Sequence, residues 1–327
     1  MEKRTLGATD LAVTRLSLGG LFISSYGAAF EQARQATLRA LELGVNYIDT
    51  APGYGNSEEV LGKILAEVEE PVILSTKLGG RPQPFEPQNA AALRQSVEES
   101  LRLLGREQID VLMVHEPDRP GQYNWWTDHE AYEGPVLELL AELKAEGVIR
   151  YTGLGGTTAY TLARLIRTGK FDVVLTAFNY SLLWREAEIE VLPAAREQGM
   201  GIVIGSPLQQ GALAARHDDQ VAGGAPWLSR PRREQLKALY AFLDELGMGI
   251  VEVALRFVIS NDSVTCALMG ARSAAEVEQN VAYVEKGPLD ADVLRRLDEI
   301  AAAVPFRPFE EPFGLPWGGG YLGPGQA

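Results

Sequence analysis

The sequence is poor in cysteine, in histidine and in long hydrophobic runs, and each shortage argues against a class of protein. The 327 residues include a single cysteine, Cys266, so no disulfide can form within the chain, as is usual for cytoplasmic proteins. Cys266 lies in the apolar run VTCALMG and is expected to be a small buried hydrophobic residue. The three histidines show no metal-ligand spacing, so no metal site is expected. The apolar runs are far shorter than the roughly 20 residues of a membrane-spanning helix.

Basic residues are also fewer than acidic ones. The chain has 30 Lys and Arg residues against 44 Asp and Glu residues, a net charge of −14. Such an acidic surface repels nucleic acid and anionic membranes, so the expected partner is a small molecule, and the oligomeric state stays open. An anionic ligand would need a local pocket of basic side chains or backbone amides.

A repeated order of amphipathic helix, glycine and strand-length apolar run predicts the fold. In LRALELGVNYID and AAREQGMGIVIG, Gly44 and Gly199 stand where a left-handed residue ends a helix. The following runs are apolar on both faces, as in parallel strands covered by helices. Strands are expected near 16–20, 45–50, 71–77, 109–115, 150–155, 172–178, 201–206 and 264–269. Helices are expected near 31–43, 57–66, 88–104, 135–146, 158–168, 186–198, 273–284 and 290–303, with an extra helical stretch over 232–259.

Eight alternating units favour a (β/α)8 TIM barrel, an α/β fold, over an open doubly wound sheet, which six clear and two weaker strands would also satisfy. We expect a single barrel domain over residues 1–327. An N-terminal β-hairpin around GATD precedes it, and an extended C-terminal loop begins near Arg307.

Four polar side chains lie at or just beyond the ends of three successive predicted strands. Asp49, Lys77 and His115 each end an apolar run, and Tyr54 follows Asp49 across the turn APGYG. Barrel enzymes assemble their active sites at these strand ends. A lysine ammonium would lower the pKa of the tyrosine phenol from about 10, and an aspartate would keep that lysine charged. His115 would orient a substrate oxygen. Each residue alone has a structural explanation, but together they predict general acid–base catalysis.

None of the four side chains can accept a hydride, so redox chemistry would need a nicotinamide cofactor. The segment RLSLGGLFISS lacks the GxGxxG spacing of a Rossmann domain. A late anion site is offered by Gly270, Arg272 and Ser273, where the eighth strand gives way to a helix. The same segment is also explained by a capping box between Ser273 and Glu276 beside a surface arginine.

The sequence resembles the aldo-keto reductase superfamily over nearly its whole length, and is nearest the sugar (aldose) 1-dehydrogenase-like branch. The motifs that carry the resemblance are GVNYIDTAPGYGNSEEVLG, STK, LRLLGREQIDVLMVHEPD, SPL and MGARSAAEVEQN. It implies a (β/α)8 barrel that binds NAD(P)(H) extended across its strand ends. It implies Tyr54 as proton donor or acceptor, Lys77 and Asp49 as its tuners, and His115 as the residue that orients the carbonyl. The implied cofactor contacts are Ser206, Leu208, Gly270, Arg272, Glu276, Gln279 and Asn280.

Three positions depart from the commoner pattern of that family. Its usual Ser-Asn after the fifth strand is Gly155-Gly156, and its glutamine at the end of the sixth is Ala177. Asn179 is close enough in sequence to substitute for the glutamine. Where the family usually stacks an aromatic residue on the nicotinamide, this chain has Gly205, so Tyr180 is a candidate for that contact.

The choice between the two nicotinamide cofactors depends on two residues of the late anion site. Arg272 would attract the 2′-phosphate of NADP, whereas Glu276 would repel it unless turned back to its helix cap. NADP(H) is slightly favoured over NAD(H), and no metal cofactor is expected.

An aromatic-rich insertion predicts the substrate side of the site. The stretch PDRPGQYNWWTDHEAYEGP carries Trp125 and Trp126, which would suit stacking on a sugar ring or a planar carbonyl compound. Phe22, Trp184 and Trp227 are further candidate walls. The alternative is a loop packed on its own aromatic residues.

We therefore predict an NAD(P)(H)-dependent oxidoreductase of the aldo-keto reductase type. It would interconvert a carbonyl compound or aldose with its alcohol or lactone, with Tyr54 as general acid or base. One alternative is a catalytically weak nicotinamide-binding regulatory or sensor subunit of the same fold. Another is a barrel glycosidase or isomerase. The HEPD motif would suit a metal or glycosidase cluster, but strand geometry points Glu116 away from His115.

Overall fold

The computed structural model describes residues 1–225, 228–308 and 311 of the chain. Trp227, a candidate substrate wall, lies outside the described residues, and so does most of the expected C-terminal loop. Within the described part, no helix combines the length and the apolar character that crossing a bilayer requires.

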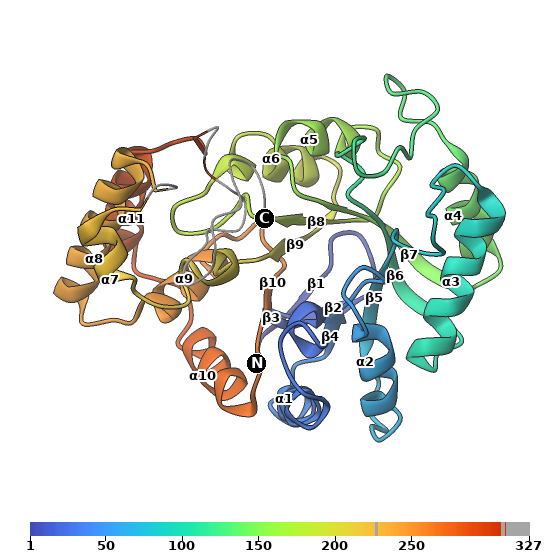
Figure 1. Cartoon of the computed structure of the whole chain (residues 1–327), viewed down its shortest axis with the longest axis horizontal. Helices are drawn as coiled ribbons and strands as arrows, with labels where there is room; N and C mark the ends of the chain where they lie inside the picture. Colours follow the sequence, from blue (N-terminus) through green and yellow to red (C-terminus); the bar gives the residue numbers. More distant parts are fainter. Residues whose placement is uncertain (226–227, 309–310, 312–327) are drawn as a thin grey trace.

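Eight parallel strands form a closed barrel in chain order, with the last strand paired to the first, so the predicted (β/α)8 TIM barrel is confirmed (Figure 1). Each strand overlaps its expected range. The strands are β3 (Leu16–Gly19), β4 (Tyr47–Asp49), β5 (Ile73–Leu78), β6 (Ile109–His115), β7 (Ile149–Gly156), β8 (Val173–Ala177), β9 (Gly201–Gly205) and β10 (Cys266–Met269).

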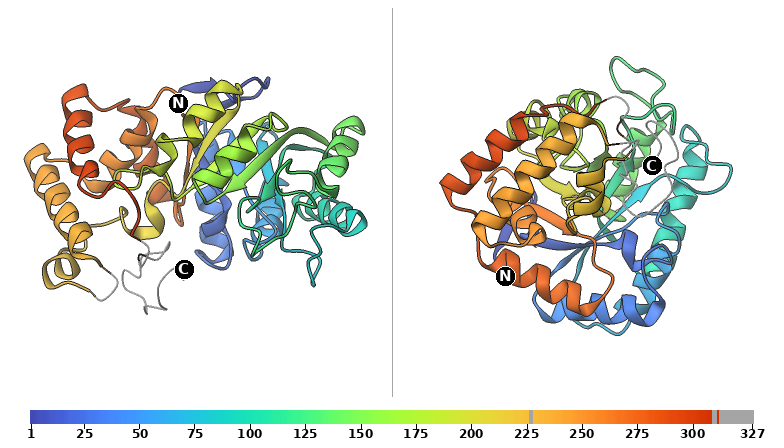
Figure 2. Two further views of the ribbon diagram at one scale, coloured as in Figure 1. Left: turned by 90° about the horizontal axis from the view of Figure 1, so that it is seen from above. Right: turned by 60° about the vertical axis from the view of Figure 1, so that its left-hand side comes forward.

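Helices surround the barrel between successive strands (Figure 1). Those of the regular alternation are α1 (Phe30–Glu42), α2 (Ser57–Leu65), α3 (Ala90–Leu104), α4 (Pro135–Ala145), α5 (Tyr160–Ile166), α6 (Val191–Glu197), α9 (Ile250–Ile259) and α10 (Ala274–Glu285). The additional ones are α7 (Asp218–Gly223), α8 (Arg230–Leu246) and α11 (Ala291–Ala302), with the short 3-10 helices η1 (Gly20–Ile23), η2 (Glu186–Glu188) and η3 (Gln209–Gly211). Helices α8 and α11 lie side by side in both whole-chain figures (Figures 1 and 2).

The prediction of one continuous helical stretch over 232–259 is wrong about its continuity. It is two helices, because Gly247 takes the left-handed conformation, with φ of 62°, and ends α8 before α9 begins. Helix α9 then covers the barrel as the seventh regular helix, while α8 extends away from it. The expected helix over 186–198 is likewise η2 followed by α6.

Two hydrophobic cores hold the fold together. One fills the space between the strands and the surrounding helices. The other fills the barrel interior with side chains such as Tyr47, Val111, Val203 and Cys266. The predicted hairpin, β1 (Lys3–Thr5) and β2 (Ala12–Thr14), pairs antiparallel and contributes further interior residues, so it plugs the amino end of the barrel. Figure 2 shows the hairpin at one end of the strands. The functional residues therefore have only the carboxyl end available.

The carboxyl ends of the strands carry most of the strained backbone in the described residues. The non-glycine residues with positive φ there are Glu116, Phe178, Ser206, Gln209 and Gln210, which follow β6, β8 and β9. Such conformations are sparsely populated and persist where the surrounding structure holds them, commonly at functional sites.

Gly62 of α2 offers a test of the helix packing. A Cβ at this position would lie 1.9 Å from the carbonyl oxygen of Leu103 in α3, which is backbone and cannot move aside cheaply. Alanine normally stabilises a helix relative to glycine by up to about 1 kcal/mol. Here we expect Gly62→Ala to lower the free energy of unfolding by about 1–3 kcal/mol, measured by urea denaturation. The control is Gly121→Ala, where nothing lies within 4 Å and no loss is expected. Equal stability of the two variants would contradict the close approach.

Candidate active site

A buried ion pair lies at the centre of the site. Lys77 on β5 and Asp49 on β4 are each 1% exposed, and the lysine Nζ donates to Asp49 Oδ2 at 2.6 Å. Nζ also donates to the carbonyl of Thr50 at 2.8 Å. Burial acts to lower the pKa of Lys77, but the charges of Asp49 and Tyr54 act against it, and the net pKa lies above its ordinary value. The ammonium therefore stays charged at neutral pH.

Two residues that sequence reasoning missed fix the aspartate. Ser75 Oγ donates to Asp49 Oδ1 at 2.6 Å and accepts from the hydroxyl of Tyr47 at 2.8 Å. The sequence contains a pattern that predicts both contacts: Tyr47 precedes Asp49 by two residues, and Ser75 precedes Lys77 by two. Side chains two apart on a strand share a face. The register that pairs Asp49 with Ser75 completes the arrangement.

Tyr54 lies beside the ion pair, as the sequence predicts. The Lys77 Nζ is 4.7 Å from the centroid of its ring. The expected lowering of its pKa is wrong for the protein without bound ligand. Lys77 does act to lower it, but desolvation by burial is the larger effect, and the pKa of Tyr54 is raised above 10. The phenol therefore holds its proton at neutral pH in this structure.

His115 completes the predicted set. Its ring meets that of Tyr54 edge-on, with centroids 5.8 Å apart. Burial and the charge of Lys77 lower the pKa of His115 to about 3, so the imidazole is neutral at physiological pH. Its Nδ1 is buried and has no hydrogen-bond partner among the described residues. The backbone carbonyl of His115 accepts a hydrogen bond from Trp125 Nε1 at 2.9 Å, which holds the end of β6 in place.

A cavity of about 250 Å³ opens beside Asp49 and Tyr54 and reaches Arg272 beyond β10. It lies across the carboxyl ends of β3, β4, β8, β9 and β10. Among the predicted cofactor residues, its lining includes Ser206, Leu208, Gly270 and Arg272. Phe22, predicted on the substrate side, also lines it, and its ring would lie 2.7 Å from a Cβ at Gly270. The groove therefore has a polar, proton-carrying end at Tyr54 and a cationic end at Arg272.

The cationic end of the groove combines a helix cap with a candidate anion site, the two interpretations that the sequence left open for this segment. The Ser273 side chain accepts a hydrogen bond from the amide of Glu276 and caps α10. Glu276 turns back to accept from the backbone amide of Arg272 at 2.8 Å and from its guanidinium at 3.1 Å. The Arg272 side chain is 60% exposed, so it remains accessible from the groove. A helix N-terminus and a guanidinium suit a phosphate group.

The other predicted cofactor residues lie in different surroundings. Asn280 is buried, with its amide 4.0 Å from the sulfur of Met269, while Gln279 on the same helix is exposed. Asn179 is buried near the ends of β7 and β8 and donates to the carbonyl of Thr157 at 2.8 Å.

Tyr180 is not placed for the stacking contact considered for it. It is buried, its ring packs near Phe257 of α9, and its hydroxyl accepts from Asn261. The ring therefore packs toward the helical layer, and the cavity lining does not include it. Sequence proximity to β8 was the wrong guide, because the strand ends at Ala177 and the backbone turns at Phe178, whose φ is 67°.

The glycines that depart from the family pattern stand where larger side chains do not fit. A Cβ at Gly155 would lie 3.3 Å from Lys77 Cε, and one at Gly156 would lie 2.8 Å from Asp118 Oδ1. At Gly205 a Cβ would lie 3.0 Å from Leu175 and 3.1 Å from Ala177. The space beside these glycines is occupied by side chains of β5, β6, β8, α5 and the loop after β6.

The three predicted tryptophan walls are buried structural residues. Trp126 donates to the carbonyl of Pro117, and Trp184 lies against the Arg232 guanidinium, 4.4 Å from its ring. Neither they nor Trp125 line the cavity. The prediction that these tryptophans form open stacking walls is therefore wrong. Trp125 and Trp126 belong to a loop that packs on its own aromatic residues, the alternative that the sequence left open, and Trp184 is buried beyond β8.

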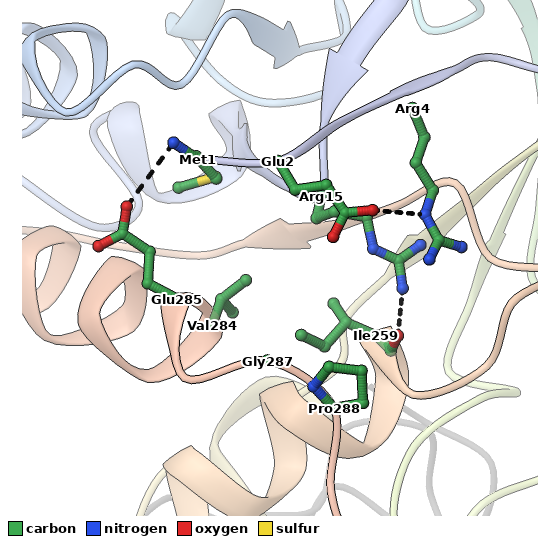
Figure 3. Close-up of a pocket in the computed structure, with 9 residues that line it drawn as sticks. All are labelled: Met1, Glu2, Arg4, Arg15, Ile259, Val284, Glu285, Gly287 and Pro288. Atoms are coloured by element: carbon green, nitrogen blue, oxygen red, sulfur yellow. Dashed lines mark hydrogen bonds and ion pairs between the residues drawn. The ribbon is translucent and has the colours of Figure 1, made fainter.

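A larger cavity, of about 470 Å³, lies at the opposite end of the barrel, near the start of β3 (Figure 3). Its polar groups are already bonded within the chain. Arg15 donates to the carbonyls of Ile259 and Val264, and Arg4 donates to Glu2. These bonds fasten the C-terminus of α9 to the hairpin. The described residues hold no cluster of three or more His, Cys, Asp or Glu suited to a metal ion.

Comparisons with known proteins agree with this geometry. The sequence model described as aldo/keto reductase family matches residues 15–302. NADH-specific methylglyoxal reductase of Escherichia coli (strain K12) is 31% identical over 89% of this chain and 96% of its own length. L-galactose dehydrogenase of Arabidopsis thaliana is 30% identical over 93% of this chain and 95% of its own. The solved structure of aldo-keto reductase AKR11C1 from Bacillus halodurans, in its holo form, matches with a TM-score of 0.75 and 29% identity, over 93% of this chain and 97% of that one.

The buried ion pair makes a stability prediction. Asp49→Asn leaves the Lys77 ammonium buried without its counter-charge, and we expect it to lower the free energy of unfolding by about 3–5 kcal/mol at pH 7. Without Asp49, burial lowers the pKa of Lys77 below its unfolded value. The difference in free energy of unfolding between the wild type and the variant should therefore become smaller as the pH rises towards the ordinary pKa of lysine, because burying a neutral lysine costs less than burying a charged one.

Denaturation of the wild type and the variant across this pH range measures the effect. The control is Glu59→Gln, which breaks the exposed pair with Lys63. That variant should lose no more than about 0.5 kcal/mol. A deficit in Asp49→Asn that does not change with pH would contradict a charged Lys77.

Proposed function

The chain belongs to the aldo/keto reductase family and is an NAD(P)-dependent oxidoreductase, and we propose that it interconverts a carbonyl compound or aldose with its alcohol or lactone. Tyr54 is the general acid in reduction and the general base in oxidation. The observation that carries this assignment is the buried Lys77 ammonium, fixed by Asp49 at 2.6 Å and lying 4.7 Å from the Tyr54 ring centroid.

Each side chain of the set has a definite task. Tyr54 keeps its proton in the free protein, because burial raises its pKa, and can pass that proton to a carbonyl oxygen. Lys77 stabilises the phenolate that remains. His115 is neutral, so one ring nitrogen can donate a hydrogen bond to the same oxygen without adding charge. The nicotinamide supplies the hydride, or accepts it in the reverse direction.

The residues of the groove suit a dinucleotide. Its proton-carrying end holds Asp49 and Tyr54, and its far end holds Gly270 and Arg272 beside the start of α10. Anionic phosphates would meet the helix N-terminus and a guanidinium there. Ser206 and Leu208 on the β9–η3 loop would line the middle of the bound molecule.

We propose that the Arg272–Glu276 pair sets the cofactor preference. The exposed guanidinium of Arg272 gives a slight advantage to the 2′-phosphate of NADP(H), while Glu276 competes for the same guanidinium. This competition keeps NAD(H) usable, in line with the NADH-specific relative.

Removing the phenolic hydroxyl tests the catalytic assignment. The turnover of Tyr54→Phe should fall about 10²–10⁴-fold, because the variant lacks the hydroxyl that carries the transferred proton, while the affinity for NADPH barely changes. Steady-state kinetics over a panel of aldoses and simple aldehydes, with fluorescence titration of the cofactor, gives both quantities. The control is Tyr160→Phe, on an exposed tyrosine of α5, which should keep normal turnover.

Two results would contradict the assignment. Near-normal turnover of Tyr54→Phe would remove Tyr54 as the proton donor. A wild-type protein that binds NADPH but turns over no member of the panel would favour the regulatory alternative.

The cofactor preference has its own test. Arg272→Ala should raise the KM for NADPH several times more than the KM for NADH, because only the former carries the 2′-phosphate. Glu276→Gln should act in the opposite direction and lower the KM for NADPH. The control is Arg295→Ala on α11, an exposed arginine with the same i, i+4 pairing to Glu299. Equal, small effects on both cofactors would remove Arg272 from this role.

A further inference from the structure

Glu116 follows His115 at the carboxyl end of β6, with its backbone in the left-handed region at φ of 49°. The expectation that Glu116 points away from His115 assumed strand geometry, which does not continue to this residue. Its Oε2 accepts a hydrogen bond from the hydroxyl of Thr157, just beyond β7, at 2.6 Å. The carbonyl of Thr157 in turn accepts from Asn179, beyond β8. The carboxylate is therefore held in one position on the rim.

The second oxygen of this carboxylate, Oε1, makes no hydrogen bond to any described residue. The nearest cation is Arg119, whose Nη1 lies 3.9 Å from Oε2, and 12% of the Glu116 side chain is exposed. Glu116 is not part of the lining of the cavity beside Tyr54, but its charge acts on the pKa of Tyr54, and that of Lys77 acts on its own. The carboxylate therefore lies near the catalytic residues, at the carboxyl end of the barrel. An ionised carboxylate accepts hydrogen bonds and donates none. The complement of Oε1 is thus a hydrogen-bond donor on a molecule in the mouth.

We propose that Glu116 is a substrate-binding residue that accepts hydrogen bonds from hydroxyl groups of a polyhydroxylated carbonyl substrate, such as an aldose. This inference rests on the proposed oxidoreductase function and narrows its substrate class. Hydrogen bonds from hydroxyl groups to a carboxylate are among the stronger ones in proteins. A simple aldehyde lacks such donors, and a keto acid would be repelled by Glu116 and by Asp118 beside it.

The charged groups around Glu116 determine when it can act as an acceptor. Burial raises its pKa to about 7, and the neighbouring carboxylate of Asp118 adds to the rise. The hydrogen bond from Thr157 and the charges of Arg119 and Lys77 act in the opposite direction. Glu116 is therefore largely protonated below pH 7 and ionised above it, and aldose binding should strengthen as the pH rises through neutrality.

The two catalytic rings do not ionise in this range. His115 is neutral, because its pKa is lowered to about 3, and the pKa of Tyr54 is raised above 10, with the Glu116 charge contributing to that rise. Burial also raises the pKa of Asp118. A pH effect on KM near neutrality that is confined to hydroxylated substrates therefore points to the Glu116–Asp118 pair, and its loss in Glu116→Gln assigns it to Glu116.

The experiment compares Glu116→Gln with the wild type on two kinds of substrate, aldoses, with L-galactose first in the panel, and methylglyoxal. At pH 8 the KM of the variant for the aldose should rise roughly ten- to hundredfold, the value of a charged hydrogen bond. The KM for methylglyoxal should change little. Between pH 6 and 8 the wild-type KM for the aldose should fall, whereas that of the variant should stay high and flat.

Thr157→Val gives an independent readout. It removes the hydrogen bond that lowers the pKa of Glu116, so the pH at which the aldose KM falls should move upwards. The control is Glu188→Gln, another carboxyl with a raised pKa, beside Arg185 and Asp298, which should leave both KM values unchanged.

The outcomes separate this inference from the function it rests on. An active Glu116→Gln enzyme with an unchanged aldose KM overturns the inference alone. Equal losses on both substrates, with a lower melting temperature, also overturn it, because they indicate a structural role. If Glu116→Gln does not fold, an unmoved pH midpoint in Thr157→Val overturns it. A wild type inactive on every aldose and aldehyde would instead refute the proposed function.

Discussion

A lysine ammonium buried inside the mouth of the barrel has to stay protonated, and the surrounding residues serve that requirement. Lys77 has Asp49 at 2.6 Å and the Thr50 carbonyl at 2.8 Å, while Ser75 and Tyr47 hold the aspartate. None of these bonds would form without the parallel register of β4 and β5. The barrel therefore acts as a rigid frame that keeps one positive charge next to one phenol.

That charge has different consequences for its two neighbours. It lowers the pKa of His115, which already favours the neutral form because it is buried. For Tyr54 it opposes burial and only limits the rise in pKa. The result is a neutral imidazole beside a protonated phenol, with the positive charge held on the lysine 4.7 Å from the phenol ring centroid. A proton leaving Tyr54 produces an anion next to a cation that is already in position, so little reorganisation is needed.

The sequence predicted the residues whose positions follow from strand ends, and failed where packing decides. Asp49, Lys77 and His115 end apolar runs, and parallel strands bring such ends together whatever the loops do. By contrast, an aromatic-rich insertion has the same composition whether its rings line a pocket or fill a core. Trp125 and Trp126 fill a core, because their indole N–H groups reach the backbone carbonyls of His115 at the end of β6 and of Pro117 just after it. Burial of this kind depends on tertiary contacts that no local pattern encodes.

The two glycines that end β7 show how the buried lysine and the packing around it affect the same strand end. Gly155 leaves room for the stem of Lys77, and Gly156 leaves room for Asp118, whose Oδ2 accepts from the amide of Thr158 at 2.6 Å. A Cβ at Gly155 would lie 3.3 Å from the lysine stem, and one at Gly156 would lie 2.8 Å from the aspartate. Polar groups then reach the same rim from the neighbouring strand, as Glu116 does. The two glycines that end β7 thus leave room for the charged side chains that β5 and the loop after β6 bring to the rim.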